Sequence, residues 1–348
     1  MALHNKVDRR VLKEQMEKSP ARRTTFSFYR YFSIAEPEEF RDKLYQFFDK
    51  WLIFGRVYVA KEGINGQVSI PSESLASFRQ NFYTEYPKLN GVRLNIALDD
   101  DGKSFYKLKI KVRKKIVADG LAEGSFDVFN KGTYLNAEEF NDLTERPGTV
   151  VVDMRNHYES EVGHFESAVL PDVDTFREAL PHVVELLSDK KGQPVIMYCT
   201  GGIRCEKASA YMKHHGFQDV YQLDGGIIEY GRQVKEKGLE NKFLGKNFVF
   251  DERLGERISE KIIANCHQCG APCDTHVNCR NEACNLLFIQ CESCAEKMEG
   301  CCSAECKSFV QLPLELQKEQ RKGIKNPARY YKKGRFELSN KSSSPALE

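Results

Sequence analysis

The sequence predicts a multidomain α/β protein in which an α+β domain comes first, an α/β domain with a parallel sheet second, and a small cysteine-rich module last. Strand-like and helix-like patterns alternate through the first 240 residues, and apolar runs such as Val150–Met154 are typical of buried parallel strands. Ten of the 12 cysteines lie between Cys266 and Cys306. The expected boundaries are 1–22 for a polar N-terminal arm, 23–118 for the first domain, 128–240 for the second, 241–310 for the cysteine-rich module and 311–348 for a basic, partly disordered tail.

The length and composition are those of a globular protein with several domains. A chain of 348 residues is long for one core, since single cores stop growing near ~250 residues. With 41% hydrophobic and 29% charged residues, global disorder and fibrous repeats are excluded. No stretch approaches the ~18 apolar residues of a membrane span, and the first residues lack the apolar core of a secretory signal. We therefore expect a cytoplasmic protein without a membrane partner.

The charge is distributed unevenly along the chain. Residues 1–115 carry a net charge of +9, residues 116–306 of −13 and residues 307–348 of +6. The basic ends could hold a polyanion, but a solvated surface with local bias explains them equally well.

Residues 23–118 show the order β-α-β-β-α-β, which predicts a ferredoxin-like, or acylphosphatase-like, domain. Pro37 suits a first helical turn, and large apolar side chains recur after it at helical spacing. Gly63 and Asn65 permit a tight reversal within 61–65. The expected strands are 24–34, 55–60, 66–71 and about 92–98, and the expected helices follow Glu36 and cover 72–83, the second with a serine cap.

A strand within 105–117 separates an apolar face from a basic one. Leu108, Ile110 and Val112 alternate with four cations, Lys107, Lys109, Lys111 and Arg113. Such a row could track a phosphate backbone, and we predict that it contacts RNA. The alternative is a sheet edge guarded by lysines against aggregation.

The second domain alternates buried strands with helices, which predicts an α/β sheet covered on both faces. The expected strands are 150–154, 195–199 and 220–223, and the expected helices are 137–143, 175–187 and 204–214.

The loop that follows the strand at 195–199 carries the main chemical signal. Cys199 ends that strand, and Thr200, Gly201, Gly202 and Ile203 precede a helix. Backbone N–H groups and the helix dipole at such a place stabilise an anion, so we expect a lowered pKa and a nucleophilic thiolate. Arg204 would add positive charge, whereas Cys205 is expected to serve packing.

Other motifs accompany this loop and point to a known family. Asp153-Met154-Arg155, Glu159, Gly163-His164 with Ala168, and the later Gly225-Gly226-Ile227 are similar to the motifs of the rhodanese domain. The resemblance implies that Asp153 and Arg155 brace the loop structurally and that Cys199 carries a covalent adduct. By this resemblance, residues 128–240 are a rhodanese domain.

The wider sequence resembles the bacterial tRNA uridine-34 hydroxylases of the rhodanese superfamily. The resemblance rests on the first domain, the loop 199–210, the segment 245–259 and the cysteine-rich module. It implies oxygen-dependent conversion of uridine 34 in a tRNA anticodon loop to 5-hydroxyuridine, with molecular oxygen as co-substrate and without DNA as a partner. The residues alone favour a sulfurtransferase with a persulfide on Cys199, which remains the alternative. No flavin, nucleotide or 2-His-1-carboxylate motif is visible.

The cysteine-rich module contains two CxxC knuckles, Cys266/Cys269 and Cys291/Cys294. These four cysteines are the expected ligands of a structural zinc ion, and ten thiols suffice for two such sites with two left over. An iron–sulfur cluster or reduced thiols held by packing are the alternatives. In the tail, the basic aromatic stretch 328–336 is a further candidate for RNA contact.

Overall fold

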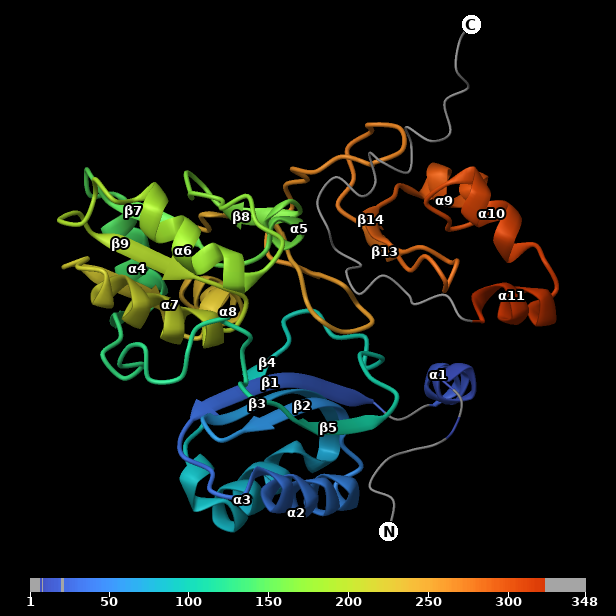
Figure 1. The fold of residues 1–348 in the computed structure, drawn as a ribbon, viewed down its shortest axis with the longest axis horizontal. Helices are drawn as coiled ribbons and strands as arrows, with labels where there is room; N and C mark the ends of the chain where they lie inside the picture. Colours follow the sequence, from blue (N-terminus) through green and yellow to red (C-terminus); the bar gives the residue numbers. More distant parts are fainter. Residues whose placement is uncertain (1–6, 8, 20–21, 323–348) are drawn as a thin grey trace, which may run out of the picture.

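The computed structural model describes residues 7, 9–19 and 22–322 and confirms the mixed α/β class (Figure 1). An N-terminal sheet domain, a central domain with a parallel sheet and a cysteine-rich C-terminal region follow one another along the chain. The exact domain boundaries stay predictions. The tail from residue 323 on, with its basic aromatic stretch, lies outside the described residues. Every helix in the described ranges is too short or too polar to span a lipid bilayer.

The N-terminal domain has the split βαβ arrangement that its sequence predicts. Its elements are α1 (Arg9–Lys18), β1 (Arg23–Tyr31), α2 (Pro37–Lys50), β2 (Phe54–Ala60), β3 (Gly63–Pro71), a 3-10 turn (Ser72–Ser74), α3 (Leu75–Glu85), a second 3-10 turn (Pro87–Leu89), β4 (Asn95–Ile96) and β5 (Leu108–Val112). The strands lie in the order β4-β1-β3-β2-β5, with β3 antiparallel to both β1 and β2. Helices α2 and α3 cover one face and pack an aromatic-rich core against it (Figure 1). The other face of the sheet carries polar side chains.

Several local expectations differ from this domain's structure, and the strands expected at 24–34 and about 92–98 are Arg23–Tyr31 and Asn95–Ile96. Strand β3 begins at Gly63, three residues before the prediction, because Gly63–Asn65 pair with the end of β1. The helix expected from Ser72 opens as a 3-10 turn, and α3 has no side-chain cap. Strand β5 covers only Leu108–Val112 of the alternating run.

The central domain is a four-stranded parallel sheet with helices on both faces. Its elements are β6 (Thr133–Leu135), α4 (Ala137–Thr144), β7 (Val150–Asp153), α5 (His157–Ser160), α6 (Phe176–Leu186), β9 (Val195–Tyr198), α7 (Ile203–His214), β10 (Val220–Leu223) and α8 (Gly226–Lys237). The strands lie in the order β6-β10-β9-β7. Helices α6 and α7 pack on one face and α4 and α8 on the other, so that successive residues of β7 and β9 enter opposite cores.

The C-terminal part starts as an extension of the central domain. Its elements are β11 (Phe243–Asn247), β12 (Glu256–Arg257), β13 (His276–Asn278), β14 (Leu287–Ile289), α9 (Glu292–Met298), α10 (Ala304–Val310) and α11 (Leu314–Arg321). Strand β11 pairs with β8 (Gly163–Phe165) of the central domain, whereas the hairpin β13–β14, the segment before it that carries Cys266 and Cys269, and α9 to α11 form the cysteine-rich part.

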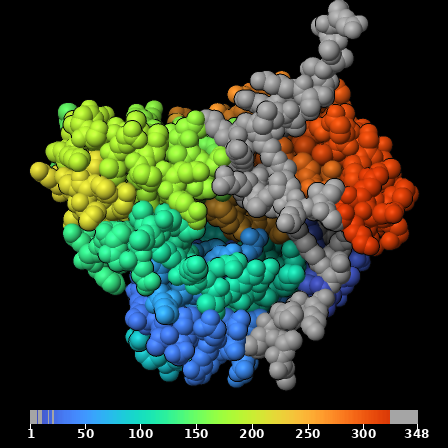
Figure 2. Space-filling model, viewed as in Figure 1, coloured from blue at the N-terminus to red at the C-terminus, as the bar shows by residue number. Residues whose placement is uncertain are grey.

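The three parts meet around the open face of the N-terminal sheet. In Figure 2 the N-terminal domain (blue) lies below the central domain (green to yellow), and the C-terminal module (orange to red) lies beside it. A buried ion-pair cluster joins the first two parts: the Nζ of Lys207 on α7 lies 2.6 Å from Asp119 and 2.8 Å from Glu62. This cluster fixes the N-terminal sheet against the helix that follows the Cys199 loop.

Candidate active site

The Cys199 loop forms a nest of donors around a buried sulfur. Cys199 follows β9 directly and has no exposed surface. The N–H of Gly202 donates to Sγ at 3.2 Å, and Gly202 adopts φ +97°, which an L side chain would strain. The N–H groups of Ile227 and Ile228 donate to the carbonyls of Cys199 and Thr200, so the predicted Gly-Gly-Ile turn holds the loop from behind.

The surroundings of Cys199 favour the thiolate. Burial raises the pKa of this thiol, but hydrogen bonds from Cys205 and from the backbone, together with the charge of Arg204, lower it to about 6. Cys205 is itself buried, and burial and the nearby sulfur raise the pKa of its own thiol, which keeps it a donor. Sequence reasoning assigned Cys205 to packing, but its thiol also supports the nucleophile. A thiol with this pKa favours the thiolate form at neutral pH, which is the form that the predicted nucleophile requires.

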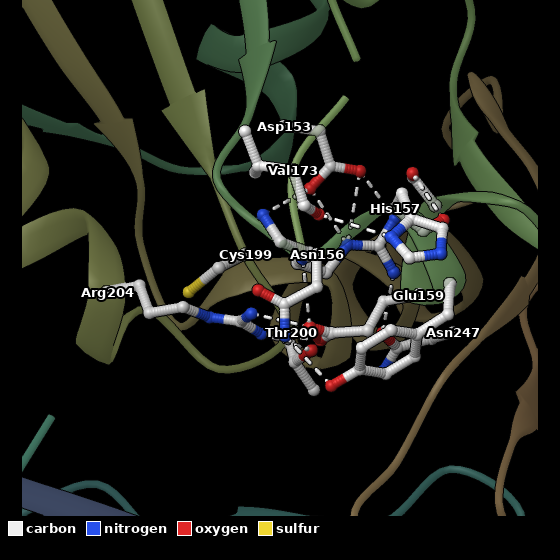
Figure 3. Close-up of polar contacts among 12 residues, drawn as sticks. Asp153, Asn156, His157, Glu159, Val173, Cys199, Thr200, Arg204 and Asn247 are labelled. Carbon is white, nitrogen blue, oxygen red and sulfur yellow. Dashed lines mark hydrogen bonds and ion pairs between the residues drawn. The ribbon is translucent and has the colours of Figure 1, made fainter. Parts of the chain in front are cut away.

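Arg204 is held by a carboxylate that the sequence analysis left without a role. Its guanidinium donates two hydrogen bonds to Glu159, at 2.5 and 2.7 Å, and one to the Thr200 hydroxyl at 3.3 Å (Figure 3). The expected positive charge is therefore paired, and Arg204 fixes the loop as much as it attracts an anion. Glu159 sits in the first turn of α5, where the spacing Asn156-x-x-Glu159 is a capping-box signal.

Asp153 and Arg155 brace the elements around the loop without touching its sulfur. Arg155 is fully buried and binds Asp153 through two nitrogens, and it also donates to the carbonyl of Gly163 at 2.6 Å. These bonds join the end of β7 to β8. The predicted role of the two residues in bracing the Cys199 loop itself stays a prediction.

A cavity of about 460 Å³ lies between the Cys199 loop and the open face of the N-terminal sheet. Cys199, Thr200, Gly201, Ile203 and Arg204 line its central-domain side. Its opposite wall consists of side chains from four strands of the N-terminal sheet and includes Ser27, Tyr29, Arg56, Tyr58, Asn65, Gln67 and Asn95. Cys199 therefore lies opposite a wall of polar side chains from another domain, and no local sequence motif predicts this neighbourhood.

A buried carboxylate ties this wall to the helix behind the loop. Glu206 on α7 accepts hydrogen bonds from Tyr29 at 3.0 Å, from Tyr134 at 2.8 Å and from Lys131 at 2.6 Å. Burial, followed by the charges of Glu206 and Cys199, raises the pKa of Tyr29 well above its ordinary value. Tyr29 therefore stays a neutral wall residue next to the thiolate.

Comparison with known proteins identifies the family to which this architecture belongs. Three family models match: a UPF0176 acylphosphatase like domain over residues 23–116, a Rhodanese-like domain over 136–233 and a Rhodanase C-terminal model over 244–307. A protein of Enterobacter sp. (strain 638) named tRNA uridine(34) hydroxylase is 56% identical over 99% of both chains. Proteins with the same name are 54% identical in Photorhabdus laumondii, over 99% of this chain and 98% of that protein, and in Escherichia fergusonii, over 99% of both.

The chain belongs to the tRNA uridine(34) hydroxylase family. The resemblance found in the sequence is confirmed over nearly the whole chain. A family of hydroxylases also identifies the protein as an enzyme and accounts for a rhodanese-like loop without making the protein a sulfur carrier.

In this hydroxylase fold, the predicted RNA-binding cations line a groove that adjoins the active-site cavity. Lys107, Lys109 and Lys111 border a hollow of about 390 Å³, and Arg56 and Tyr58 line both it and the Cys199 cavity. Strand β5 is also the edge of the sheet, so the position of these lysines is equally compatible with protection of that edge against aggregation. Burial and the neighbouring cations Lys111 and Arg56 lower the pKa of Lys109. A bound anion would offset this repulsion and stabilise the charged form of the lysine. Arg113 is exposed at the end of the same strand but does not line the groove.

Eight cysteines gather in two sets of four. Cys266, Cys269, Cys291 and Cys294, the predicted ligands, have their sulfurs within 4.8 Å of one another, and so have Cys279, Cys284, Cys302 and Cys306. Cys273 and Cys301 are the two left over. The sulfur–sulfur distance is 3.6 Å both for Cys269–Cys291 and for Cys284–Cys302. A tetrahedron with Zn–S bonds of about 2.3 Å has edges of about 3.8 Å, so both sets fit zinc.

The knuckles also carry the backbone support that thiolate ligands need. The N–H of Cys291 donates to the sulfur of Cys266 at 3.4 Å, and the N–H of Cys302 donates to the sulfur of Cys279 at 3.5 Å. The first set lies against the central domain, because His267 between its cysteines bonds Glu161, just after α5, at 2.8 Å.

Proposed function

We propose that this protein hydroxylates uridine 34 of tRNA at C5, giving 5-hydroxyuridine, with Cys199 as the nucleophile. The observation that carries the proposal is a buried sulfur, with a pKa of about 6, at a cavity that combines apolar and polar side chains and lies beside a cationic groove. The names of the close relatives support the substrate. A base of the anticodon loop can leave its stack at little cost and enter such a cavity. A tRNA substrate also supports a cytoplasmic location.

The proposed chemistry starts from the poor reactivity of C5 in uracil. Addition of the Cys199 thiolate to C6 forms a C–S bond and moves an electron pair to C5 and O4. The N–H of Gly202 donates to the sulfur before attack, and we expect Arg204 or the backbone N–H groups of the loop to stabilise the negative charge that develops. C5 then takes one atom of molecular oxygen, while the other atom leaves as water after receiving two electrons and two protons from an external two-electron reductant. Loss of the C5 proton and cleavage of the C–S bond restore the aromatic base and the thiolate.

Nucleoside analysis of bulk tRNA tests the reaction class. A deletion strain should lose 5-hydroxyuridine and its derivatives in a mass spectrum, the wild-type gene should restore them, and the gene for Cys199→Ser should not. Loss of a thiolated base in their place would establish the sulfurtransferase with a Cys199 persulfide and refute the hydroxylase.

We further propose that the cysteine-rich module binds two structural zinc ions, one in each set of four cysteines. The donor sets and their sulfur–sulfur spacing support this assignment. Zinc supplies cross-links there, which a module with few large apolar residues needs for folding. It supplies no redox chemistry. Elemental analysis of the purified chain should give two zinc ions. Cys294→Ser and Cys306→Ser should each remove one, whereas Cys273→Ser, outside both sets, should keep two; iron with sulfide would establish a cluster instead.

A further inference from the structure

Asn95 carries an unpaired amide oxygen in the wall that faces Cys199. The residue lies in β4 and is only 3% exposed. Its Nδ2 donates a long hydrogen bond of 3.5 Å to the carbonyl of Gly201, two residues after the nucleophile. Its Oδ1 is closed off from water and has no partner among residues 7, 9–19 and 22–322. An acceptor without a partner costs the free protein stability, which suggests that a ligand completes it.

The neighbouring backbone fixes which end of the amide faces the substrate. Two oxygens repel, so the end next to the Gly201 carbonyl must be the NH₂ group, and the free end must be the acceptor. A Cβ on Gly201 would lie only 3.6 Å from Nδ2, so Asn95 borders the loop at van der Waals distance. The weak bond to Gly201 permits a small swing of the amide toward the cavity.

The main chain around Asn95 is held on both sides. Asn95 pairs with Ser27 of β1 in the sheet register. Arg232 of α8 donates to the carbonyl of Ile96 at 3.0 Å, and the N–H of Leu98 donates to the buried carboxylate of Glu256 at 3.1 Å. The amide is thus presented from a fixed strand, as selective recognition of a ligand requires.

The chemistry of this amide matches the imide edge of uracil. Uracil offers one donor, N3–H, between the acceptors O2 and O4, whereas cytosine offers an acceptor at N3 and a donor at N4. An amide with its oxygen free accepts from N3–H, and its NH₂ group donates to an adjacent carbonyl of the base. Because the Gly201 carbonyl disfavours the flipped amide, the pair that cytosine needs is disfavoured too.

We propose that Asn95 binds the N3–H edge of uracil in the Cys199 cavity and selects uridine over cytidine there. This inference rests on the proposed function and names the residue that determines its base specificity. Asn95 is a specificity residue of the N-terminal domain, whereas the nucleophile belongs to the central domain. The two domains therefore divide base recognition and chemistry between them.

Equilibrium binding tests the proposal without turnover. The full chain with Cys199→Ser is titrated with anticodon stem-loop RNAs that carry uridine, cytidine or 3-methyluridine at position 34. The uridine RNA should bind about tenfold more tightly than either of the others, since one unmatched hydrogen bond has about that effect. Adding Asn95→Ala should lower uridine affinity to the level of the other two. Asn81→Ala on α3, whose amide donates to the Ser77 carbonyl within its own helix, is the matched control and should keep the preference.

Asn95→Asp, which has the same shape, decides the question if the alanine variant does not fold. It should also lose the preference, because a carboxylate cannot donate to a base carbonyl and is repelled by the Gly201 carbonyl. Equal affinity of the Cys199→Ser chain for all three RNAs, or an unchanged preference in both Asn95 variants, would overturn the proposal. A wild-type chain that forms no 5-hydroxyuridine while the preference depends on Asn95 would refute the hydroxylase and leave the recognition role standing.

Discussion

At the scale of single residues, Cys199 is set apart by what surrounds it. Its sulfur is buried and receives hydrogen bonds, whereas a serine hydroxyl at the same place would stay protonated at neutral pH. We expect Cys199→Ser to lower the rate of uridine hydroxylation by on the order of 10³ or more. The affinity for tRNA should stay within about threefold, since one buried atom changes. Single-turnover assays with saturating tRNA measure the first quantity and equilibrium titration the second; a wild-type rate would exclude covalent catalysis at this residue.

The pH dependence of the reaction follows from the same surroundings. Because the pKa of Cys199 is lowered to about 6, the reactive thiolate is present above that pH and is lost as the pH falls through it. The single-turnover rate should therefore rise with pH and level off above a midpoint of about 6.

Replacing Cys205 by Ala removes the thiol that donates to the thiolate, so the midpoint should move to higher pH. Cys205→Ser keeps a donor and should keep most of the activity and a midpoint near the wild-type value. A midpoint unchanged in Cys205→Ala would show that the backbone and Arg204 alone stabilise the thiolate.

At the scale of elements, strand β5 combines an edge position with the cationic groove. Replacing Lys107, Lys109 and Lys111 by Ala should weaken tRNA binding and reduce the slope of log affinity against log salt by roughly 0.7–0.9 for each lost phosphate contact. The hydroxylation rate at saturating tRNA should change little. The matched control replaces Lys43, Lys50 and Arg79, which are exposed on the helices at the opposite side of the same sheet. If the slope of log affinity against log salt is equal in the two triple variants, the lysines of β5 do not contact RNA and only protect the edge of the sheet.

Sequence patterns predicted what depends on neighbours along the chain. The Cys199 loop could be recognised because a strand end, two glycines and a helix start are contiguous, and the knuckle Cys266/Cys269 is likewise local. Glu206, Tyr29 and Asn95 could not be recognised, because their roles arise only when the N-terminal sheet meets α7. Glu159 did have a local signal, its capping box, but the partner that gives it a function, Arg204, lies 45 residues away.

The two cysteine clusters show the same limit within one module. The CxxC knuckles predicted which four thiols gather in the first cluster. The second set draws its cysteines from two segments with unequal spacing, Cys279/Cys284 and Cys302/Cys306, and only the fold pairs them. Spacing alone could not tell these four from Cys273 and Cys301.

At the scale of the whole molecule, the active-site cavity exists because two domains are held together. The cysteine and its loop come from the central domain, and the polar wall comes from the N-terminal sheet. Their junction contains Lys207, which is 1% exposed and bonds both Glu62 and Asp119. The stability of a buried ion-pair cluster depends strongly on each member, because removing one member leaves the other charges buried without a partner.

Replacing Lys207 by Met should therefore loosen the two domains as well as destabilise the chain. We expect a loss of about 3–5 kcal/mol, toward the lower value because Glu62 is partly exposed. The single tryptophan, Trp51, lies at the end of α2 and reports the N-terminal domain, whereas circular dichroism reports the whole chain. In the variant, the tryptophan transition in urea should separate from the dichroism transition, and tRNA hydroxylation should fall. The neutral set Lys207→Met, Glu62→Gln and Asp119→Asn removes the stranded charges and should recover part of the stability. Coincident transitions at the wild-type urea concentration would mean that the ion pairs do not hold the domains together, and that packing around the loop positions the polar wall.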